Sequence, residues 1–217
     1  MSKYYLSNEQ MLQKYGALFQ NLSKETELAT ELAEYGYDTD RVAQGKALYD
    51  RASETYQKSK KESAEETTAS AVFHQKLDEV TKIYLSDRKK AKLIFKDQPD
   101  VLKNLSLKGT SSQVIANSLQ EMKDLYQNLD ENQTLQTAVK ILKITPEHIK
   151  SQLDKITQTE TAYASYLQEK GENQQATQDK NKAFTDLDKW VRELYSFAKV
   201  ALEDKPQLLE SIAKIVK

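Results

Sequence analysis

The chain has 217 residues, and its Gly (5) and Pro (3) content is too low for the many turns of an all-β fold, so a few long helices fit better. Lys and Arg (32) nearly balance Asp and Glu (33), which gives the chain no electrostatic preference for nucleic acid or an anionic membrane. The absence of Cys excludes disulfides and thiolate chemistry. No apolar run approaches the roughly 20 residues of a membrane span, and no apolar signal region opens the chain, so we expect a soluble, cytoplasmic protein.

Two stretches of the sequence repeat each other. Asp97-Gln98-Pro99 returns as Asp204-Lys205-Pro206, at an offset of 107 residues. The same offset, held without gaps from Leu12 to about Leu105, matches Leu18 with Leu125, Leu22 with Leu129, Tyr56 with Tyr163, and Ala91 with Ala198. Matches spread over a whole unit indicate a duplication. We predict an all-α fold of two tandem helical-bundle repeats, residues 1–109 and 110–217, related by a pseudo-twofold axis and packed together.

The first helix is predicted to begin after Ser7, which has Gln10 at the capping-box position. Ser23 then has the character of a new cap, and its partner Asp130 has Gln133 three residues on. We therefore expect a break near residues 22–24 and 129–131, followed by a second short helix in each copy.

A turn follows at Tyr35-Gly36-Tyr37, and Asp38 is predicted to cap the next helix. In the second copy Thr145 is the cap and Pro146 occupies the first helical position, where the missing N–H costs nothing.

The stretches 39–96 and 146–203 keep a seven-residue repeat. One stripe contains Val42, Tyr49, Tyr56, Leu77, Tyr84 and Ala91, and the other contains Gly45, Ala52, Phe73, Val80 and Ile94. Two structures fit. The unbroken register fits a single long helix with coiled-coil packing. The polar centre of the stripe, and halves as long as the segment 8–35, favour a hairpin with its tip near residues 61–68 and 169–176, and we favour the hairpin.

Pro99 ends the long stretch, because a proline excludes the helical region for the residue before it. A short helix with Val101, Leu102 and Leu105 should follow, and the segment 108–112 links the copies. We expect Leu102 and its counterpart Leu209 to be buried.

Few residues have the character of an active site. His74 and His148 correspond to Asn181 and Arg41 in the other copy, so neither belongs to a duplicated site. A phosphoryl-accepting histidine on a helical bundle would resemble His74, but ordinary histidines on helix surfaces are far commoner. His148 lies in the first turn of a predicted helix.

Other chemistries also lack their motifs. No Glu stands three residues before either histidine, so the di-metal Glu-x-x-His motif is absent, and there is no Gly-rich phosphate loop. Glu62, Glu65 and Glu66 form a charge run with neighbouring lysines, typical of a solvated face. The basic cluster Arg88-Lys89-Lys90 with Lys92 could contact nucleic acid, but a solvated face is the commoner explanation. We expect no metal and no cofactor.

Tyrosine is frequent, at 12 residues. Tyrosines on copy-equivalent stripes could line a groove between the repeats, and this groove is the best binding site that the sequence offers. Its predicted residues are Tyr49, Tyr56, Tyr84, Tyr163 and Trp190.

Several segments together carry a family resemblance. They are Tyr35-Gly36-Tyr37 with Arg41-Val42 and Gly45, the paired Asp-x-Pro-x-x-Leu segments that begin at Asp97 and Asp204, and Glu-Asn-Gln-Gln-Ala-Thr at 172–177. In these the chain resembles an uncharacterised family of bacterial all-helical proteins with an internal duplication. The resemblance implies an intracellular protein of two like halves and assigns no activity. The second copy departs from the first motif, with Leu142-Lys143-Ile144 in its place.

The sequence therefore predicts a non-enzymatic helical scaffold or protein-interaction protein, with a protein partner or itself, as a homodimer, for partner. We expect no nucleic acid and no membrane span. The alternative is a helical bundle that binds a small ligand in the tyrosine-lined groove, which requires a pocket of some hundreds of Å³, whereas the interaction protein requires an exposed apolar strip. We expect no enzyme, although chemistry built from Asp, Glu, Lys and Tyr stays open.

Overall fold

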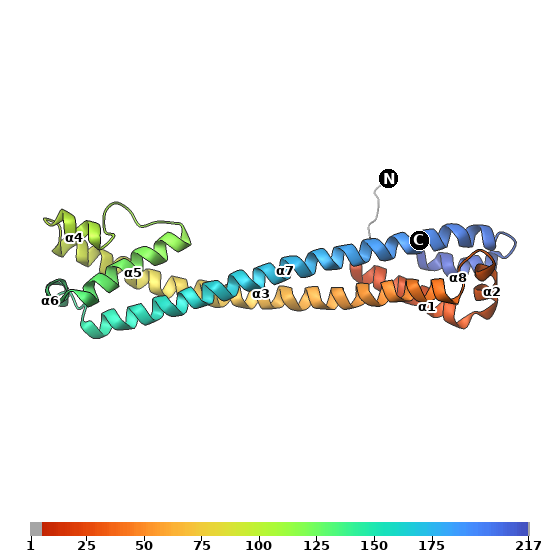
Figure 1. The fold of residues 1–217 in the computed structure, drawn as a ribbon, viewed down its shortest axis with the longest axis horizontal. Coiled ribbons are helices and arrows are strands. Elements are labelled where there is room, and N and C mark those ends of the chain that lie inside the picture. The colour runs from red at the N-terminus through yellow and green to blue at the C-terminus, as the bar shows by residue number, and fades with distance from the viewer. Residues whose placement is uncertain (1–5, 217) are drawn as a thin grey trace. The chain divides into compact units, whose positions relative to one another are not determined.

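A computed structural model describes the backbone of residues 6–216 and the side chains as far as Ile212. Within that range the chain forms eight α-helices and no strand, which confirms the all-α prediction (Figure 1). The helices in chain order are α1 (Asn8–Lys24), α2 (Thr26–Glu34), α3 (Thr39–Ile94), α4 (Pro99–Asn104), α5 (Ile115–Glu131), α6 (Gln133–Lys140), α7 (Pro146–Ala201) and α8 (Pro206–Val216).

The helices form two compact units. Unit 1 joins the residues before Glu65 with those after Lys170, and unit 2 is Glu65–Lys170. In unit 1, α1, α2 and α8 lie against the first half of α3 and the second half of α7; in unit 2, α4, α5 and α6 accompany the other halves (Figure 1). Both long helices contribute to both units. The units therefore differ from the predicted repeats 1–109 and 110–217, and the interpretation of these two segments as repeats stays a prediction.

The two long helices pack together in antiparallel orientation within each unit. In unit 1 Gly45 faces Trp190, and the rings of Tyr56 and Phe184 lie 6.2 Å apart between centroids. In unit 2 the rings of Phe73 and Tyr163 lie 4.9 Å apart. Within unit 1 the residue numbers rise along α3 as those of the contacting residues fall along α7.

The hairpin that the polar centre favoured is wrong, because α3 and α7 are each a single helix of 56 residues. The proposed tips at 61–68 and 169–176 contain no Pro and one Gly, Gly171, and they consist largely of residues such as Lys, Glu and Ala that form helices well. One Gly in a helix costs about 1 kcal/mol, which does not end it. The polar centre of the stripe is part of the helix and forms no turn. Ser59, for example, is buried in α3 although its side chain carries a hydroxyl.

Three of the predicted helix starts are confirmed. Ser7 and Gln10 form the capping box of α1. Asp38 Oδ1 accepts the Arg41 N–H at 2.9 Å, and Thr145 Oγ1 accepts the His148 N–H at 3.3 Å. These caps satisfy amide groups that have no partner inside the helix.

The two predicted caps at the breaks are each wrong by two residues, since the N-caps are Glu25 and Asn132. The breaks exist, but Ser23 lies inside α1 and donates its hydroxyl to the Gln20 carbonyl at 2.8 Å. Asp130 lies inside α5, and Asn132 caps α6 by accepting from two backbone amides. Ser and Asp side chains bond to nearby backbone groups inside a helix as well as at its start, so neither residue alone fixes where the next helix begins.

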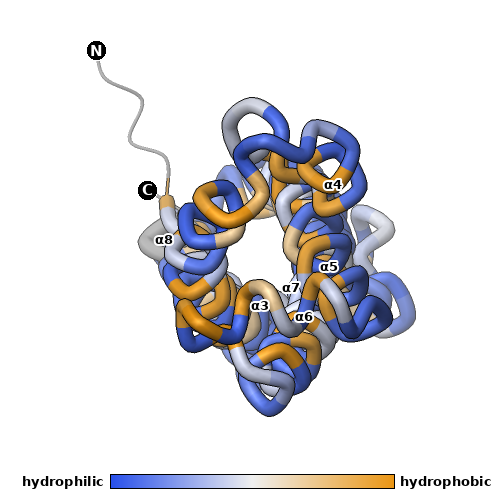
Figure 2. Tube along the Cα trace, turned by 90° about the vertical axis from the view of Figure 1, so that its left-hand side faces the viewer, coloured by the Kyte–Doolittle hydropathy of each residue, from blue (hydrophilic) through white to orange (hydrophobic). Residues whose placement is uncertain are grey.

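Each unit has its own hydrophobic core. Along the helices hydrophobic and hydrophilic residues alternate, as expected for amphipathic helices (Figure 2). The core of unit 1 contains Tyr15, Leu18, Phe19, Leu22, Leu28, Leu32, Tyr37, Ala52, Ala183, Phe184, Leu187, Trp190, Val191, Leu194, Ala198, Leu202 and Ile212. The core of unit 2 contains Val80, Tyr84, Ala91, Phe95, Leu105, Leu107, Leu119, Met122, Leu125, Tyr126, Leu129, Val139, Ile144, Ile149 and Ile156. Leu102 and Leu209 are half-buried against these cores, less than we expected.

No helix in the described part of the chain is both long enough and apolar enough to cross a lipid bilayer.

Candidate functional site

A groove of about 650 Å³ opens in unit 1, and all of its lining comes from one continuous part of the chain. We call it the unit 1 groove. Its lining residues are Gly16, Phe19, Gln20, Leu22 and Ser23 of α1, Ala29 and Ala33 of α2, Tyr37 and Asp38 of the following turn, and Thr39, Val42, Ala43, Lys46 and Tyr49 of α3.

Small side chains create the space. Ala29 and Ala33 are one turn apart on α2, and Ala43 stands on α3, so no long side chain from these positions fills the groove. Gly16 of α1 allows a close approach of α3: a Cβ atom at this position would lie 2.8 Å from the hydroxyl of Tyr49. At the positions 107 residues later the chain has Lys123, Gln136, Lys140 and Lys150, all with long side chains.

Aromatic rings form the apolar part of the lining. Phe19 lies between Tyr49, at 5.7 Å, and Trp190 of α7, on which it stacks at 5.5 Å. Tyr37 meets Trp190 edge-on at 5.7 Å. Such tilted and offset arrangements are the favourable ones for aromatic pairs, so the rings hold one another in place.

Two polar atoms in this aromatic cluster are buried without a hydrogen-bond partner among the described residues, the Tyr37 hydroxyl and Nε1 of Trp190. Burial raises the pKa of Tyr37. The Arg41 guanidinium lies 4.3 Å from the centre of the Tyr37 ring and forms an ion pair of 2.8 Å with Glu193. The charged groups that line the groove itself are Asp38 and Lys46, one of each sign. The lining thus favours no net charge on a bound molecule.

Unit 2 contains a polar cluster built on Asp87, whose side chain is 2% exposed. Oδ2 of Asp87 accepts the Tyr126 hydroxyl at 2.9 Å and lies 2.5 Å from Nε2 of His148, while Oδ1 accepts from Lys90 at 3.0 Å. These contacts join α3, α5 and α7. Burial and the adjacent Asp87 carboxylate raise the pKa of Tyr126. The cluster satisfies a buried carboxylate, as folded proteins require.

The basic residues beside Asp87 act within the fold. Arg88 is buried, and it donates to the Tyr84 hydroxyl at 2.8 Å and to the carbonyl of Ser106 at 2.7 Å. Lys92 donates to the carbonyl of Gly109 at 2.7 Å. Ser106 and Gly109 have positive φ angles of 52° and 67°, so these donors hold a tight link between α4 and α5. The solvated face that the sequence favoured for this cluster is wrong for Arg88, since this side chain is buried and its guanidinium donates to backbone carbonyls.

The five residues of the predicted tyrosine groove lie in both units. Tyr49 lines the unit 1 groove, and Trp190 contacts two rings that line it. Tyr56 is also in unit 1 and donates to Glu9 at 2.8 Å. Tyr84 and Tyr163 belong to unit 2, against Arg88 and Phe73 respectively. The structure thus brings Tyr49 and Trp190 into one aromatic cluster; a groove between the repeats stays a prediction.

Most of the groove and the Asp87 cluster were not predicted from the sequence. Tyr37 was assigned only to a turn, and Phe19 was given no role in a binding site. A signal for Asp87 existed: it stands seven residues after Val80 and seven before Ile94, at a heptad position that is buried. His74, by contrast, is exposed, as the sequence led us to expect.

Comparisons of this chain with protein-family models, with curated proteins and with solved structures gave no match. No family is therefore identified, and the resemblance drawn from the sequence motifs stays a prediction.

Proposed function

We propose that the protein binds a small, neutral, aromatic molecule in the unit 1 groove. The observation that carries the proposal is the groove itself, about 650 Å³ in volume and lined mainly by rings and apolar side chains, beside the polar side chains of Gln20, Ser23, Asp38, Thr39 and Lys46. Sites for small molecules have volumes of about 300–1,000 Å³ and this kind of lining. A pocket of this size is the feature that separates ligand binding from a scaffold role.

The chemistry of the lining selects the ligand class. The rings of Phe19 and Tyr49 offer stacking surfaces, and Ala29 and Ala33 leave space for a flat molecule. The opposite charges of Asp38 and Lys46 give the lining no net charge, so an ionised ligand would lose its hydration without a matched partner.

The single tryptophan of the chain provides the test. Trp190 stacks on Phe19, a lining residue, so a bound aromatic molecule should change its fluorescence. We would titrate the intact protein with N-phenyl-1-naphthylamine, a neutral aromatic probe, and follow both the loss of Trp190 emission and the rise of probe emission. We expect saturable binding.

A matched pair of variants locates the binding. Ala43 lines the groove, and Ala47 lies one turn later on α3, exposed and outside the lining. Ala43→Leu should weaken probe binding at least about tenfold, because its added atoms take the space of the ligand, whereas Ala47→Leu should leave binding unchanged. Absence of saturable binding, or equal binding by both variants, would contradict the proposal.

We also propose that the chain consists of two structural repeats related by a pseudo-twofold axis. The helix bounds support it: α1 and α5 begin at residues 8 and 115 and end at 24 and 131, and α3 and α7 begin at 39 and 146 and end at 94 and 201. All four pairs differ by 107, the offset of the sequence match. The scaffold role that we expected first stays a prediction.

A further inference from the structure

Each hydrophobic core is built from both halves of the chain. We call residues 6–112 the first half and residues 113–216 the second half. In unit 1 the first half supplies the core residues from Tyr15 to Ala52, and the second half supplies those from Ala183 to Ile212. In unit 2 the first half supplies Val80 to Leu107, and the second supplies Leu119 to Ile156. Neither of these cores belongs to one half alone.

The short helices show the same exchange. The helix α8, from the second half, packs on α1 of the first half in unit 1. In unit 2 the helix α4, from the first half, packs on α5 of the second. Each half therefore covers its partner's amphipathic helix with its own last helix.

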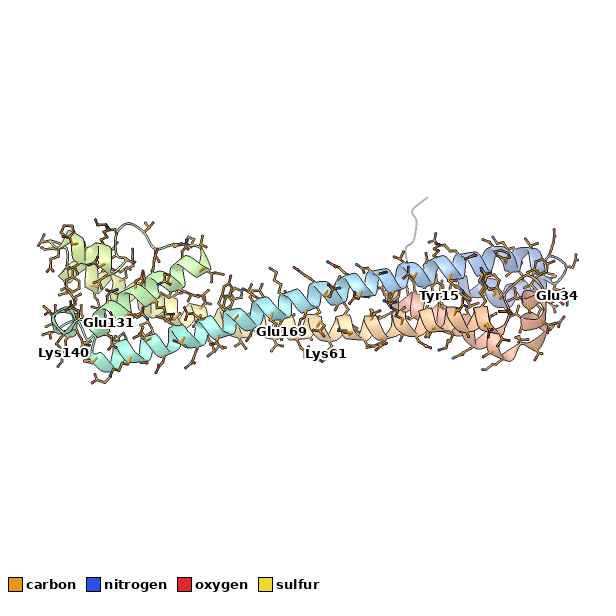
Figure 3. All side chains as sticks on the ribbon, viewed as in Figure 1. Tyr15, Glu34, Lys61, Glu131, Lys140 and Glu169 are labelled. Atoms are coloured by element: carbon orange, nitrogen blue, oxygen red, sulfur yellow. The ribbon has the colours of Figure 1, made fainter. Side chains whose placement is uncertain are left out.

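Buried polar contacts also cross between the halves. In unit 1 the Tyr15 hydroxyl donates to Oδ1 of Asp188 at 2.6 Å; Figure 3 labels Tyr15 on α1. In unit 2 Asp87 of the first half accepts from Tyr126 of the second half and contacts His148. Separation of the halves would break these hydrogen bonds, and new hydrogen bonds to water would compensate only in part for the lost stability.

Ring contacts also join the halves. Phe19 stacks on Trp190 in unit 1, and Phe73 lies 5.8 Å from Tyr166, with the two rings nearly parallel, in unit 2. A half on its own would expose these rings and the apolar stripes of its long helix to water. Large exposed apolar faces of this kind mark association surfaces.

The covalent link between the halves makes contacts mainly before Gln113. Arg88 and Lys92 hold the carbonyls of Ser106 and Gly109, and Glu121 accepts from the Ser112 amide. Gln113 is exposed. A cut between Ser112 and Gln113 therefore leaves both cores and these contacts in place.

We infer that the two halves of the chain are obligate binding partners: each presents a surface that fits the other half, from its own chain or from a second copy, and neither forms a compact unit alone. This inference rests on contacts within each unit and is independent of the ligand proposed above.

The test uses the full chain with a protease recognition site inserted between Ser112 and Gln113. After complete cleavage, size-exclusion chromatography with light scattering should show one species with the mass of the intact chain, and circular dichroism should show undiminished helix content. Two native peaks, each with the mass of one half, would overturn the inference.

A second measurement tests the exchange with another copy. Two cleaved samples, one carrying an affinity tag on its first half, would be mixed, unfolded in urea and refolded. The tagged first half should then recover untagged second half from the other sample. Refolding of the tagged half as a separate helical monomer would count against the inference.

A pair of conservative variants shows whether the seen contacts carry the association. Tyr15→Phe removes the hydroxyl that contacts Asp188 in the other half. Tyr35→Phe removes the hydroxyl of an exposed tyrosine in the same half. In the cleaved protein Tyr15→Phe should weaken association about tenfold, whereas Tyr35→Phe should leave it unchanged. Equal association of both variants and the parent would show that the halves meet differently.

Discussion

The hydroxyl of Tyr126 donates to Oδ2 of Asp87 at 2.9 Å, and both side chains are buried in unit 2. The carboxylate also contacts His148, so a single residue of α3 fixes α5 and α7. The heptad stripe places an aspartate where its neighbours along α3 are Val80 and Ile94. A hydrophobic residue at this position could pack against several neighbours, whereas the carboxylate requires particular hydrogen-bond partners. The contact therefore aligns α3, α5 and α7 in one register.

Removal of the Asp87 carboxylate should destabilise the fold strongly. We expect Asp87→Ala to lower the free energy of unfolding by about 3–5 kcal/mol, because Tyr126 and His148 lose their buried acceptor. Tyr126→Phe should cost about 1–2 kcal/mol, since it removes one hydrogen bond. Chemical denaturation followed by circular dichroism measures both values. Asp78→Ala, at an exposed position of α3, is the control and should change the free energy by less than about 0.5 kcal/mol. Equal losses for the two aspartates would disprove the structural role of Asp87.

Stability should fall at alkaline pH because of the buried tyrosines. Burial raises the pKa of Tyr126 and Tyr15, and a neighbouring aspartate contributes in each case. In the unfolded chain a tyrosine ionises near pH 10. A pKa that is raised in the folded state gives stability that is present below about pH 10 and is lost as the pH rises toward the folded pKa. Urea unfolding at neutral pH and above about pH 10 measures the difference. Tyr126→Phe should make this loss smaller, while Tyr35→Phe, at an exposed site, should not; an unchanged pH dependence in Tyr126→Phe would contradict the assignment.

Two glycines of the long helices should respond in opposite directions to alanine. A Cβ atom at Gly45 would lie 2.3 Å from the Trp190 ring, so Gly45→Ala should force α3 and α7 apart and cost about 1–3 kcal/mol. At Gly171 a Cβ atom meets nothing within 4 Å. Gly171→Ala should therefore raise the free energy of unfolding by about 0.5–1 kcal/mol through helix propensity. Thermal unfolding of both variants checks this, and a stable Gly45→Ala protein would rule out the close contact.

The leucines after Pro99 should differ in importance. Leu105 is fully buried, and Leu102 is half-buried. Leu105→Ala should cost about 2–5 kcal/mol, in the range for a buried leucine, and Leu102→Ala should cost less, because part of its side chain already contacts water. Chemical denaturation of the two variants gives the comparison. A greater loss for Leu102→Ala would mean that the link between α4 and α5 packs differently.

Local signals determined the helical class and the starts of α1, α3 and α7. Ser7 with Gln10, Asp38, and Thr145 before Pro146 specify helix starts, because a cap bonds to amides two or three residues away. Pro99 occupies the first turn of α4, and α3 itself ends at Ile94. These helix starts depend on neighbouring residues and can therefore be read from the sequence.

Tertiary packing decided the rest. The stretch 61–68 continues α3 as a helix although its stripe is polar. Whether Asp87 meets solvent or Tyr126 depends on a residue 39 positions away. The unit 1 groove likewise arises from Gly16, Ala33 and Ala43, which come from three helices, and the sequence pattern of one helix does not report which small residues will face one another. Contacts between distant residues depend on how whole helices pack. This packing determines that each core contains residues from both halves of the chain.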